Sequence, residues 1–530
     1  MNIKRVLTIG LVLLVILASI SIGYGAEIIE VTSVRTIPNP ATVKYPPGDS
    51  VYNSVWTRLY ESKLGIRLKY LWAVDQSQWE QKTNIMIASG DLPDFFLASK
   101  TQFFQLLNSG LLEDLTEVYK KYASSQTKKV LNEGGPEPLA SATFNGKLMA
   151  IPFTALAKEA VPILFIRTDW LTKLGLPEPK TMKDVLKISE TFTKKDPDGN
   201  GKNDTFGFPV DKDLYNTVLG FFNSYHAYPN IWIKDKSGKL VYGSIQPEVK
   251  TALKALQDMY KDGQIDPEFG TKDMNKVAEL VASGKVGIWY GAFWSPLWPI
   301  QDLRNRDPKA EWKPYPILTI DGRLPKLQYS LPVNGYWVVK KGSKHPEALL
   351  KIMNLWADIF YFNKSDEIWS KYGNEPVTAN EIWQNAHAQV HRAWKNLEQH
   401  YKVVGVLKGT TDISELTGDD KGVLERVRRF LEKGENTVWC WNKIYGEGGS
   451  FDVVDYYKKR NCYIMDQFFG PLTTTMTEKL PVLNKSQSET FTKIIKGAPI
   501  EEFDKFIGEW KRLGGDIVTK EVNEWYESRK

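Results

Sequence analysis

Cysteine is nearly absent from this chain, which has only Cys440 and Cys462 among its 530 residues. Neither stands directly after the apolar N-terminal segment, where a bacterial lipoprotein carries the cysteine that receives its lipid. The sequence therefore argues against a lipid anchor. The two cysteines could pair in an oxidising compartment, and two buried free thiols are the alternative.

Runs of like charge and common catalytic motifs are missing as well. No five successive residues carry the same charge, and 69 basic residues face 63 acidic ones, so nothing indicates a nucleic-acid partner. The chain lacks a GxSxG nucleophile motif and a GxxxxGK[ST] phosphate loop. His387 and His391 have the spacing of a zinc-protease pair, but Ala388 stands where the general-base Glu is needed, which favours core or surface histidines. We therefore predict a protein that is not an enzyme.

Only one apolar run approaches the length of a membrane span. In residues 1–26, Lys4 and Arg5 precede the run Val6–Ile22, and Gly23-x-Gly25 is typical of a cleavage site. We predict a secretory signal peptide, with an uncleaved N-terminal anchor as the alternative because a span needs ~20 residues. Without Lys4 and Arg5, the formal net charge of the chain is +4. We expect an exported protein that is periplasmic, secreted or at the cell surface.

Aromatic residues are abundant, at 12% of the chain with 18 tryptophans. Exposed indole rings in an exported protein suggest sugar ligands, because the apolar face of a sugar ring stacks on an aromatic plane. A large hydrophobic core with solvent-exposed edges would explain the same composition.

Helix and strand signals alternate along the chain. We expect strands over residues 27–36, 65–74 and 95–98, with helical patterns between and after them. Further on, a helix capped by Thr181 leads into the segment DPDGNGKNDTFG. This alternation predicts an α/β protein.

The segment 196–207 has the spacing of a calcium-binding loop. Calcium takes six to eight oxygen ligands, and such a loop supplies them from alternate positions with a glycine at the sharp turn. Gly201 stands at that turn, whereas Gly207 occupies the place of the usual final bidentate Glu. We predict a structural Ca²⁺ site, with a solvated Asx-rich turn as the alternative. Its expected ligands are Asp196, Asp198, Asn200, the carbonyl of Lys202, Asp204 and Thr205.

Several blocks of sequence, in order, resemble family 1 of the bacterial extracellular solute-binding proteins. They include NIMIASGDLPDFFLA, FNGKLMAIPFT, VAELVASGKVGIWYGAFWSPLWP and the C-terminal ETFTKIIKGAPIEEFDKFIGEWKRLGG. The chain looks most like the large branch that carries a calcium loop and includes alginate-binding and other oligosaccharide-binding proteins of ABC importers. The resemblance covers nearly the whole chain after the signal.

The resemblance implies a two-lobed periplasmic-binding-protein fold, similar to type II, with three hinge crossings. We expect these crossings near Pro152–Ala155, Trp289–Gly291 and Gly335–Val338. The implied boundaries are 27–152 for the first part of lobe 1, 153–290 for the first part of lobe 2 with the calcium loop, 291–336 for the second part of lobe 1, and 337–530 mainly for lobe 2 and the C-terminal helices.

The resemblance also implies ligand-binding residues at the crossings and in loops that face the cleft. Since Trp439 and Trp441 alternate, only one would face the cleft if their segment is extended. The expected contacts are Asp75, Gln76, Gln78, Trp294, Trp298, Tyr336, Trp337, Trp439 and Trp441.

Together these observations predict an exported binding protein, acting as a monomer, that delivers an oligosaccharide to the permease subunits of an ABC importer. A secreted carbohydrate-active hydrolase and a sensory sugar-binding partner of a membrane receptor are the alternatives. The sequence leaves open whether the sugar is neutral or uronic, and whether the ligand is instead a peptide.

Overall fold

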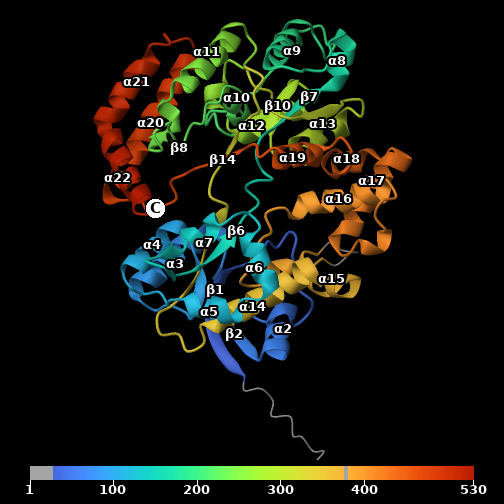
Figure 1. Cartoon of the computed structure of the whole chain (residues 1–530). Helices are drawn as coiled ribbons and strands as arrows, with labels where there is room; N and C mark the ends of the chain where they lie inside the picture. Colours follow the sequence, from blue (N-terminus) through green and yellow to red (C-terminus); the bar gives the residue numbers. More distant parts are fainter. Residues whose placement is uncertain (1–27, 364, 375–379, 530) are drawn as a thin grey trace, which may run out of the picture.

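Two separate hydrophobic cores divide the chain into two lobes (Figure 1). The computed structural model describes residues 28–363, 365–374 and 380–529, so the expected signal peptide lies outside it. The core of lobe 1 takes its residues from 31–151 and 336–390, and the core of lobe 2 from 161–327 and 393–522. In the described part of the chain, no helix is both long enough and apolar enough to cross a membrane.

Lobe 1, in the lower half of Figure 1, contains two main sheets and the short antiparallel pair β4 (Thr143–Phe144) and β5 (Lys147–Leu148). In one, β1 (Ile29–Thr36) runs parallel to β2 (Ile66–Val74); in the other, β13 (Val333–Val339) lies between β3 (Phe95–Ala98) and β6 (Ile151–Thr154), antiparallel to both. The helices around them include α2 (Val55–Leu64), α3 (Gln76–Ser89), α4 (Lys100–Asn108), α6 (Ser125–Asn132), α7 (Glu137–Ser141) and α14 (Glu347–Ala357).

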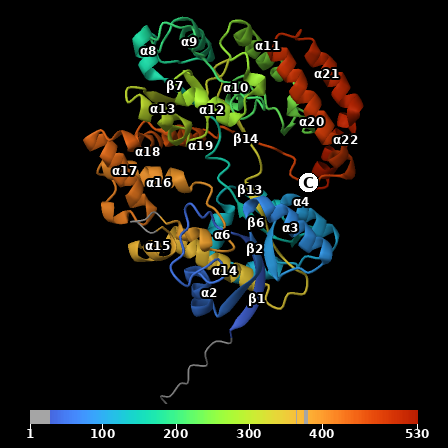
Figure 2. The same ribbon diagram turned by 180° about the vertical axis from the view of Figure 1, so that it is seen from behind.

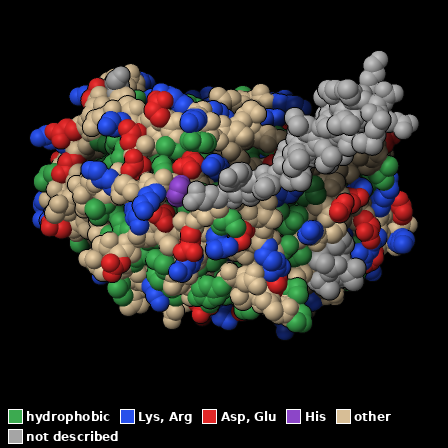
Figure 3. All heavy atoms as spheres, turned by 90° about the horizontal axis from the view of Figure 1, so that it is seen from below, with side chains coloured by type: hydrophobic (Ala, Val, Ile, Leu, Met, Phe, Trp, Pro, Cys, Tyr) green, Lys and Arg blue, Asp and Glu red, His purple; other side chains and the backbone are tan. Residues whose placement is uncertain are grey.

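Seen from below, the molecule has Lys and Arg side chains interspersed with Asp and Glu (Figure 3). This face therefore offers no continuous cationic surface of the kind that tracks a nucleic-acid backbone.

Lobe 2 is larger and more helical. Its main sheet has β7 (Ile163–Arg167) between β10 (Ile288–Gly291) and β11 (Trp312–Tyr315), and both neighbours are antiparallel to it. Two further pairs are β12 (Leu327–Tyr329) with β14 (Tyr463–Met465), and β8 (Trp232–Lys234) with β9 (Leu240–Tyr242). Its helices include α9 (Met182–Lys194), α11 (Pro247–Lys261), α12 (Met274–Ala282), α13 (Gln301–Arg306), α16 (Lys395–Leu407), α17 (Asp419–Lys433), α18 (Trp439–Tyr445), α20 (Thr474–Ile495), α21 (Glu502–Trp510) and α22 (Asp516–Glu527).

The end of the last helix of lobe 2, α22, reaches lobe 1. The C-terminus lies beside α4 when the molecule is seen from the front and from behind (Figures 1 and 2). Arg529, just after α22, donates a hydrogen bond of 2.7 Å to the carbonyl oxygen of Ala140 in α7. The lobes are thus in contact here as well as through their connecting segments.

The chain passes between the cores three times, and two of these crossings differ from the expectation. The first, between β6 and β7, follows Pro152–Ala155 directly. The second lies between Tyr329, which ends β12 in lobe 2, and Val333, which begins β13 in lobe 1, and the third lies between Val390 and Ala393. Trp289–Gly291 instead forms β10 inside lobe 2, and Gly335–Val338 lies in β13 inside lobe 1.

The expected division at 291–336 and 337–530 therefore does not match the two cores. Ile300, Leu303 and Trp312 belong to the core of lobe 2, and 336–390 contributes to the core of lobe 1. The physical reason is strand pairing: β10 bonds to β7, more than 120 residues earlier, and a local pattern of helix followed by strand does not reveal its partner.

Glu159 lies in the first crossing and meets the beginning of α16. Its carboxylate accepts hydrogen bonds from the backbone N–H of Leu397 at 2.8 Å and from the side-chain amide of Asn396 at 2.9 Å. Burial raises the pKa of this carboxyl to about 7, against these hydrogen bonds, which lower it.

This raised pKa predicts a pH-dependent stability. The unfolded carboxyl titrates near 4.5, so between pH 4.5 and 7 the folded state binds the proton more tightly. The contribution of Glu159 to stability is then fully present below pH 4.5 and is lost as the pH rises through about 7. We expect Glu159→Gln to gain up to about 3 kcal/mol over the wild type between pH 5 and 8, measured by urea unfolding. A difference that does not change with pH would contradict this assignment.

Candidate ligand-binding site

A pocket of about 950 Å³ lies in lobe 1 at the carboxyl ends of β1, β2, β3 and β6. In α/β folds, ligands bind outside the carboxyl ends of parallel strands, because the loops that follow the strands meet there. The side chains around this pocket include Arg35, Asp75, Trp79, Phe153, Trp337 and Trp383.

Aromatic rings and fixed polar groups form its walls. The indole N–H of Trp337 donates to the carbonyl oxygen of Gln389 at 2.9 Å, which fixes the orientation of its ring. Trp79, on α3, lies 5.6 Å from Trp72 between ring centroids. His387 is buried beside the pocket with Nε2 2.7 Å from the Ser33 hydroxyl, and burial lowers its pKa well below the usual value. It is therefore neutral at physiological pH.

A second pocket, of about 490 Å³, lies in lobe 2. It opens where β10 ends at Gly291, and a Cβ at this position would lie 2.2 Å from Nε1 of Trp289 and 2.3 Å from the Ser295 hydroxyl. Glycine therefore lets the chain turn closely here and present the next residues to the pocket. Trp294 and Trp298 follow, with 44% and 38% of their surface exposed.

Both pockets adjoin the same two crossing segments. Phe153 and Asn334 line the pocket of lobe 1, whereas Ala157 and Ser330, a few residues away along the same segments, line the pocket of lobe 2. A change at the hinge would therefore alter the distance between the two pockets.

Five of the nine predicted ligand residues line these pockets: Asp75, Gln76 and Trp337 in lobe 1, and Trp294 and Trp298 in lobe 2. Gln78 is exposed on α3 beside the first pocket but does not line it.

Tyr336 lies away from both pockets. Its ring stacks on Phe103, with 4.4 Å between centroids, and its hydroxyl donates to Ser141 at 3.0 Å. Neighbouring residues of a strand point to opposite faces of the sheet, so Trp337 reaches the pocket and Tyr336 packs in the core.

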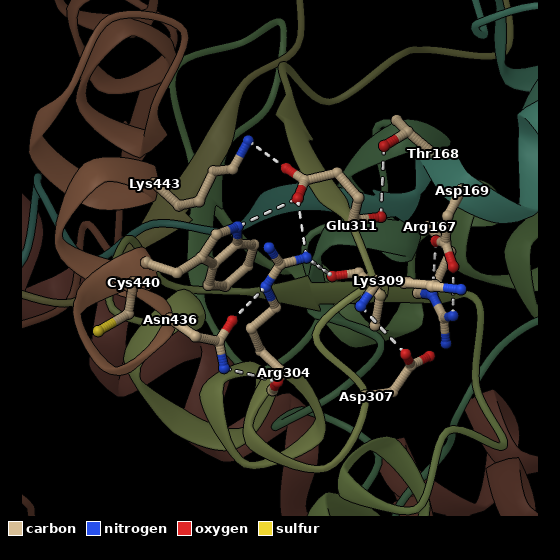
Figure 4. A network of polar contacts seen from close by, with 12 residues as sticks. Arg167, Thr168, Asp169, Arg304, Asp307, Lys309, Glu311, Asn436, Cys440 and Lys443 are labelled. Carbon is tan, nitrogen blue, oxygen red and sulfur yellow. Dashed lines mark hydrogen bonds and ion pairs between the residues drawn. The ribbon is translucent and has the colours of Figure 1, made fainter. Parts of the chain in front are cut away.

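Trp439 and Trp441 also lie elsewhere, on α18. Trp439 is fully buried, and its indole N–H donates to the carboxylate of Glu311 at 3.1 Å. Figure 4 shows this network, in which Lys443 and Arg304 also pair with Glu311.

Trp441 stacks on Tyr445, and the Arg426 guanidinium lies 4.4 Å from its ring centroid. Side chains alternate between two faces only in an extended segment, and this segment is helical.

Other pocket residues were not predicted. Arg35, Glu80, Phe153 and Trp383 come from four separate parts of the chain, and nothing local marks them as neighbours. Trp79 could have been predicted from the sequence, because it lies one helical turn after Asp75, the residue that precedes α3.

The loop 196–207 connects α9 to the rest of lobe 2. Asp196 accepts hydrogen bonds from the backbone N–H groups of Gly199, Asn200 and Gly201 at 2.9–3.1 Å. The Asn200 amide donates to Asp198 and Asp204, so the side chains at alternate positions converge.

The Lys285 ammonium also enters this loop, 2.6 Å from Asp204 and 3.2 Å from Asp198. The hydroxyl of Thr205 donates instead to the carbonyl of Phe192, at 2.8 Å. Across the described ranges, no group of three or more His, Cys, Asp or Glu residues is arranged to hold a metal ion. The oxygen donors of the loop suit Ca²⁺ in kind and spacing, but Lys285 shares two of the carboxylates.

Cys440 and Cys462 are both buried free thiols. Burial raises the pKa of Cys440 to about 11, so this thiol is protonated and unreactive at neutral pH.

Comparisons with known proteins agree with this architecture. The family model of the bacterial extracellular solute-binding proteins matches residues 46–358, more than half of the chain. Lipoprotein LipO of Bacillus subtilis (strain 168) is 25% identical over 488 residues, 89% of this chain and 88% of that protein. The polygalacturonan/rhamnogalacturonan-binding protein YtcQ of the same organism is 27% identical over 251 residues, 46% of this chain and 47% of that protein.

The fold has counterparts among solved structures. One is an EF-hand mutant of the Streptococcus pneumoniae ABC-transporter substrate-binding protein FusA in complex with fructo-nystose. It has a TM-score of 0.58 and 17% identity, and the match covers 94% of this chain and 99% of that one. The predicted two-lobed α/β fold is confirmed, and the chain belongs to the bacterial extracellular solute-binding protein family.

Proposed function

We propose that this protein captures an oligosaccharide between its two lobes and delivers it to the permease subunits of an ABC importer. The observation that carries the proposal is the pair of exposed tryptophans, Trp294 and Trp298, in the lobe 2 pocket beside the hinge. Across the crossing segments, Trp79, Trp337 and Trp383 line the pocket of lobe 1. Indole rings on both sides suit the two apolar faces of a sugar chain.

The proposed mechanism is closure of the lobes on the ligand. Two domains joined by short crossing segments move as hinged bodies, and a ligand that contacts both domains stabilises the closed state over the open one. The importer would recognise the closed form. No chemical step is part of this mechanism, so we propose that the protein has no catalytic activity of its own.

A thermal-shift screen against neutral and uronic oligosaccharides tests this function. A ligand at 100 times its Kd adds about 2.7 kcal/mol to the free energy of unfolding, an easily measured shift. Each sugar that gives a shift is then incubated with the protein and recovered. An unchanged sugar agrees with a transport protein, whereas cleavage products would favour a hydrolase. No shift with any oligosaccharide would contradict the proposal.

We also propose that the protein acts outside the cytoplasm as a monomer, exported by the segment 1–26. The family description, extracellular, supports this location. The relative LipO is described as a lipoprotein, whereas in this chain no cysteine stands directly after the apolar segment 6–22.

We propose in addition that the loop 196–207 binds a structural Ca²⁺. Asp196, Asp198, Asn200, Asp204 and the carbonyl of Lys202 would hold it, with Lys285 displaced. The EF-hand named for the similar FusA structure supports this proposal at the level of the fold.

Calcium binding should therefore be limited by Lys285. Replacing this residue by Gln removes the cation that pairs with Asp198 and Asp204. We expect Lys285→Gln to bind Ca²⁺ about tenfold more tightly, because about 1.4 kcal/mol of competing interaction is lost.

Calorimetric titration with Ca²⁺ measures the change. Lys276→Gln is the matched control, since Lys276 carries the same charge but pairs with Glu279 on α12. If neither the wild type nor Lys285→Gln binds Ca²⁺, and a chelator leaves the melting temperature of both unchanged, the loop is a solvated turn.

A further inference from the structure

We propose that the site selects neutral oligosaccharides and disfavours uronate-containing ones. This inference rests on the proposed function and adds the chemical class of the sugar. It is supported by the charges around three cavities: the lobe 1 pocket, the lobe 2 pocket and a third cavity that residues of both lobes line. Carboxylate ligands are held in proteins by Arg and Lys side chains, or by helix N-termini, that are free to pair with them.

The lobe 2 pocket has no charged wall. None of the described residues that line it is Lys, Arg, His, Asp or Glu, and its polar groups are amides and hydroxyls such as those of Asn216, Ser295 and Gln328. These groups suit sugar hydroxyls, which both donate and accept hydrogen bonds. A carboxylate moved from water into this pocket would lose solvation and gain no counter-charge.

Among the described residues that line the lobe 1 pocket, Arg35 is the one Lys or Arg, and its hydrogen-bond donors already have partners. The Arg35 guanidinium is buried and donates to the carbonyl oxygens of Thr36, Gln384 and Asn385 at 2.6–3.1 Å and to the Tyr70 hydroxyl at 3.3 Å. Binding a uronate through Arg35 would require breaking bonds to backbone carbonyls, which would then be left unpaired. The other group that could carry positive charge, His387, is kept neutral by burial.

Two carboxylates in the same pocket have no partner. Among the residues that the structure describes, the side chains of Asp75 and Glu80 make no hydrogen bond and no ion pair. They lie five residues apart at the beginning of α3, about 1.4 helical turns, and an ionised carboxylate only accepts hydrogen bonds. They are therefore suited to pairs of sugar hydroxyls and would repel a carboxylate of the ligand. They also offset the positive end of the α3 dipole, which could otherwise attract an anion.

Two lysines also lie near the cleft. Lys158, in the first crossing, lies 5.7 Å from the ring centroid of Tyr329 in the lobe 2 pocket, and its ammonium donates to the carbonyl oxygen of Gly134 at 2.7 Å. The other is Lys100. It begins α4, next to Ser99 of the lobe 1 pocket, but its side chain lines a third cavity of about 490 Å³ together with Asp213 and Asp466. Its ammonium lies 5.7 Å from the centre of the Phe468 ring, and Asp466 attracts it electrostatically. Asp466 thus partly compensates this charge. The formal net charge of the whole chain is positive, whereas the side chains of the lobe 1 pocket include two carboxylates and one guanidinium.

The test compares sugars that differ only in charge. One pair is a digest of polygalacturonan and the same digest after its carboxylates are reduced to primary alcohols. The other is a neutral oligosaccharide that binds in the thermal-shift screen, with and without oxidation of its primary hydroxyls to carboxylates. Affinities are measured by calorimetry at low salt and again in 0.5 M salt, where screening shortens the Debye length to roughly 4 Å.

We expect each uronate to bind at least about tenfold more weakly than its neutral counterpart at low salt, with a smaller difference at high salt. In the double variant Asp75→Asn/Glu80→Gln the difference should also shrink. The matched control is Glu501→Gln/Asp516→Asn, which removes the same charge from the C-terminal helices and should keep the discrimination of the wild type.

Equal or tighter binding of the uronates would overturn this inference and leave the proposed function standing. Tighter binding of a cationic amino-sugar oligomer than of its neutral counterpart would also overturn the inference that the site selects neutral sugars. A failure of every neutral, uronic and amino sugar to bind would instead remove the proposed function, and this inference with it.

Discussion

Replacing Trp298 with Ala should raise the Kd for the bound oligosaccharide about 30-fold, and the double variant Trp294→Ala/Trp298→Ala more than 100-fold. Aromatic anchors in a binding pocket contribute about 2 kcal/mol or more each, and 1.4 kcal/mol corresponds to a tenfold change in Kd. Both rings are more than one third exposed in the lobe 2 pocket, so they have free surface to offer a sugar. Calorimetry with the sugar identified in the thermal-shift screen measures the effect.

The same exposure predicts that these variants stay folded. A substitution on the surface usually changes the free energy of unfolding by less than about 0.5 kcal/mol, so the melting temperature without ligand should not move. Trp298→Phe should retain part of the affinity, because a smaller aromatic face remains.

Trp441→Ala is the matched control. Trp441 is a half-buried tryptophan of lobe 2 that stacks on Tyr445 and Arg426, outside all the pockets described above. Sequence reasoning placed it in the ligand site, and the structure places it away from the hinge pockets. A loss of affinity in Trp441→Ala equal to that in Trp298→Ala would show that the ligand lies elsewhere.

Replacing Arg392 with Met should lower the free energy of unfolding by about 3 kcal/mol. Arg392 lies in the third crossing and is nearly buried, and its guanidinium pairs with Glu133 of lobe 1 and Glu398 of lobe 2. Removing one partner of a buried ion pair costs about 3–5 kcal/mol, because the remaining charges lose their compensation. Urea unfolding followed by fluorescence measures the loss.

Two comparisons separate this effect from a general loss of charge. Arg429→Met removes the same kind of side chain from an Arg–Glu pair in which both partners are about one third exposed, and exposed pairs contribute only about 0–1 kcal/mol. In the double variant Arg392→Met/Glu133→Gln, part of the stability should return, since the buried carboxylate is removed as well. Equal losses in Arg392→Met and Arg429→Met would show that the crossing gains no stability from its ion pairs.

Much of the local structure followed from the sequence. The strand at Phe95–Ala98 has the predicted bounds, and the other two expected strands begin within two residues of theirs. Thr181 caps α9 with a reciprocal hydrogen-bonded box to Asp184, as its position before the helical pattern indicated. These features depend on residues within a few positions of one another, so a local pattern is sufficient to predict them.

The resemblance to the family predicted the two-lobed architecture. The predicted hinge crossings and lobe boundaries were only partly correct. Which strands pair is decided between segments far apart in the chain, as β10 with β7 and β13 with β3 and β6 show. The position of Lys285 in the loop 196–207 is another such case, since it lies 81 residues after Asp204.

The helices and strands, the oxygen-rich loop and the abundance of tryptophan are all visible in the sequence. Which tryptophans have a free face depends on the fold: Trp294 and Trp298 border a cavity, whereas Trp439 is enclosed by Glu311, Arg304 and Lys443. The physical reason is that the burial of a side chain depends on what packs against it, and those partners come from distant parts of the chain. For the same reason, the charge of the site, which is opposite in sign to that of the chain, appears only once the fold brings its walls together.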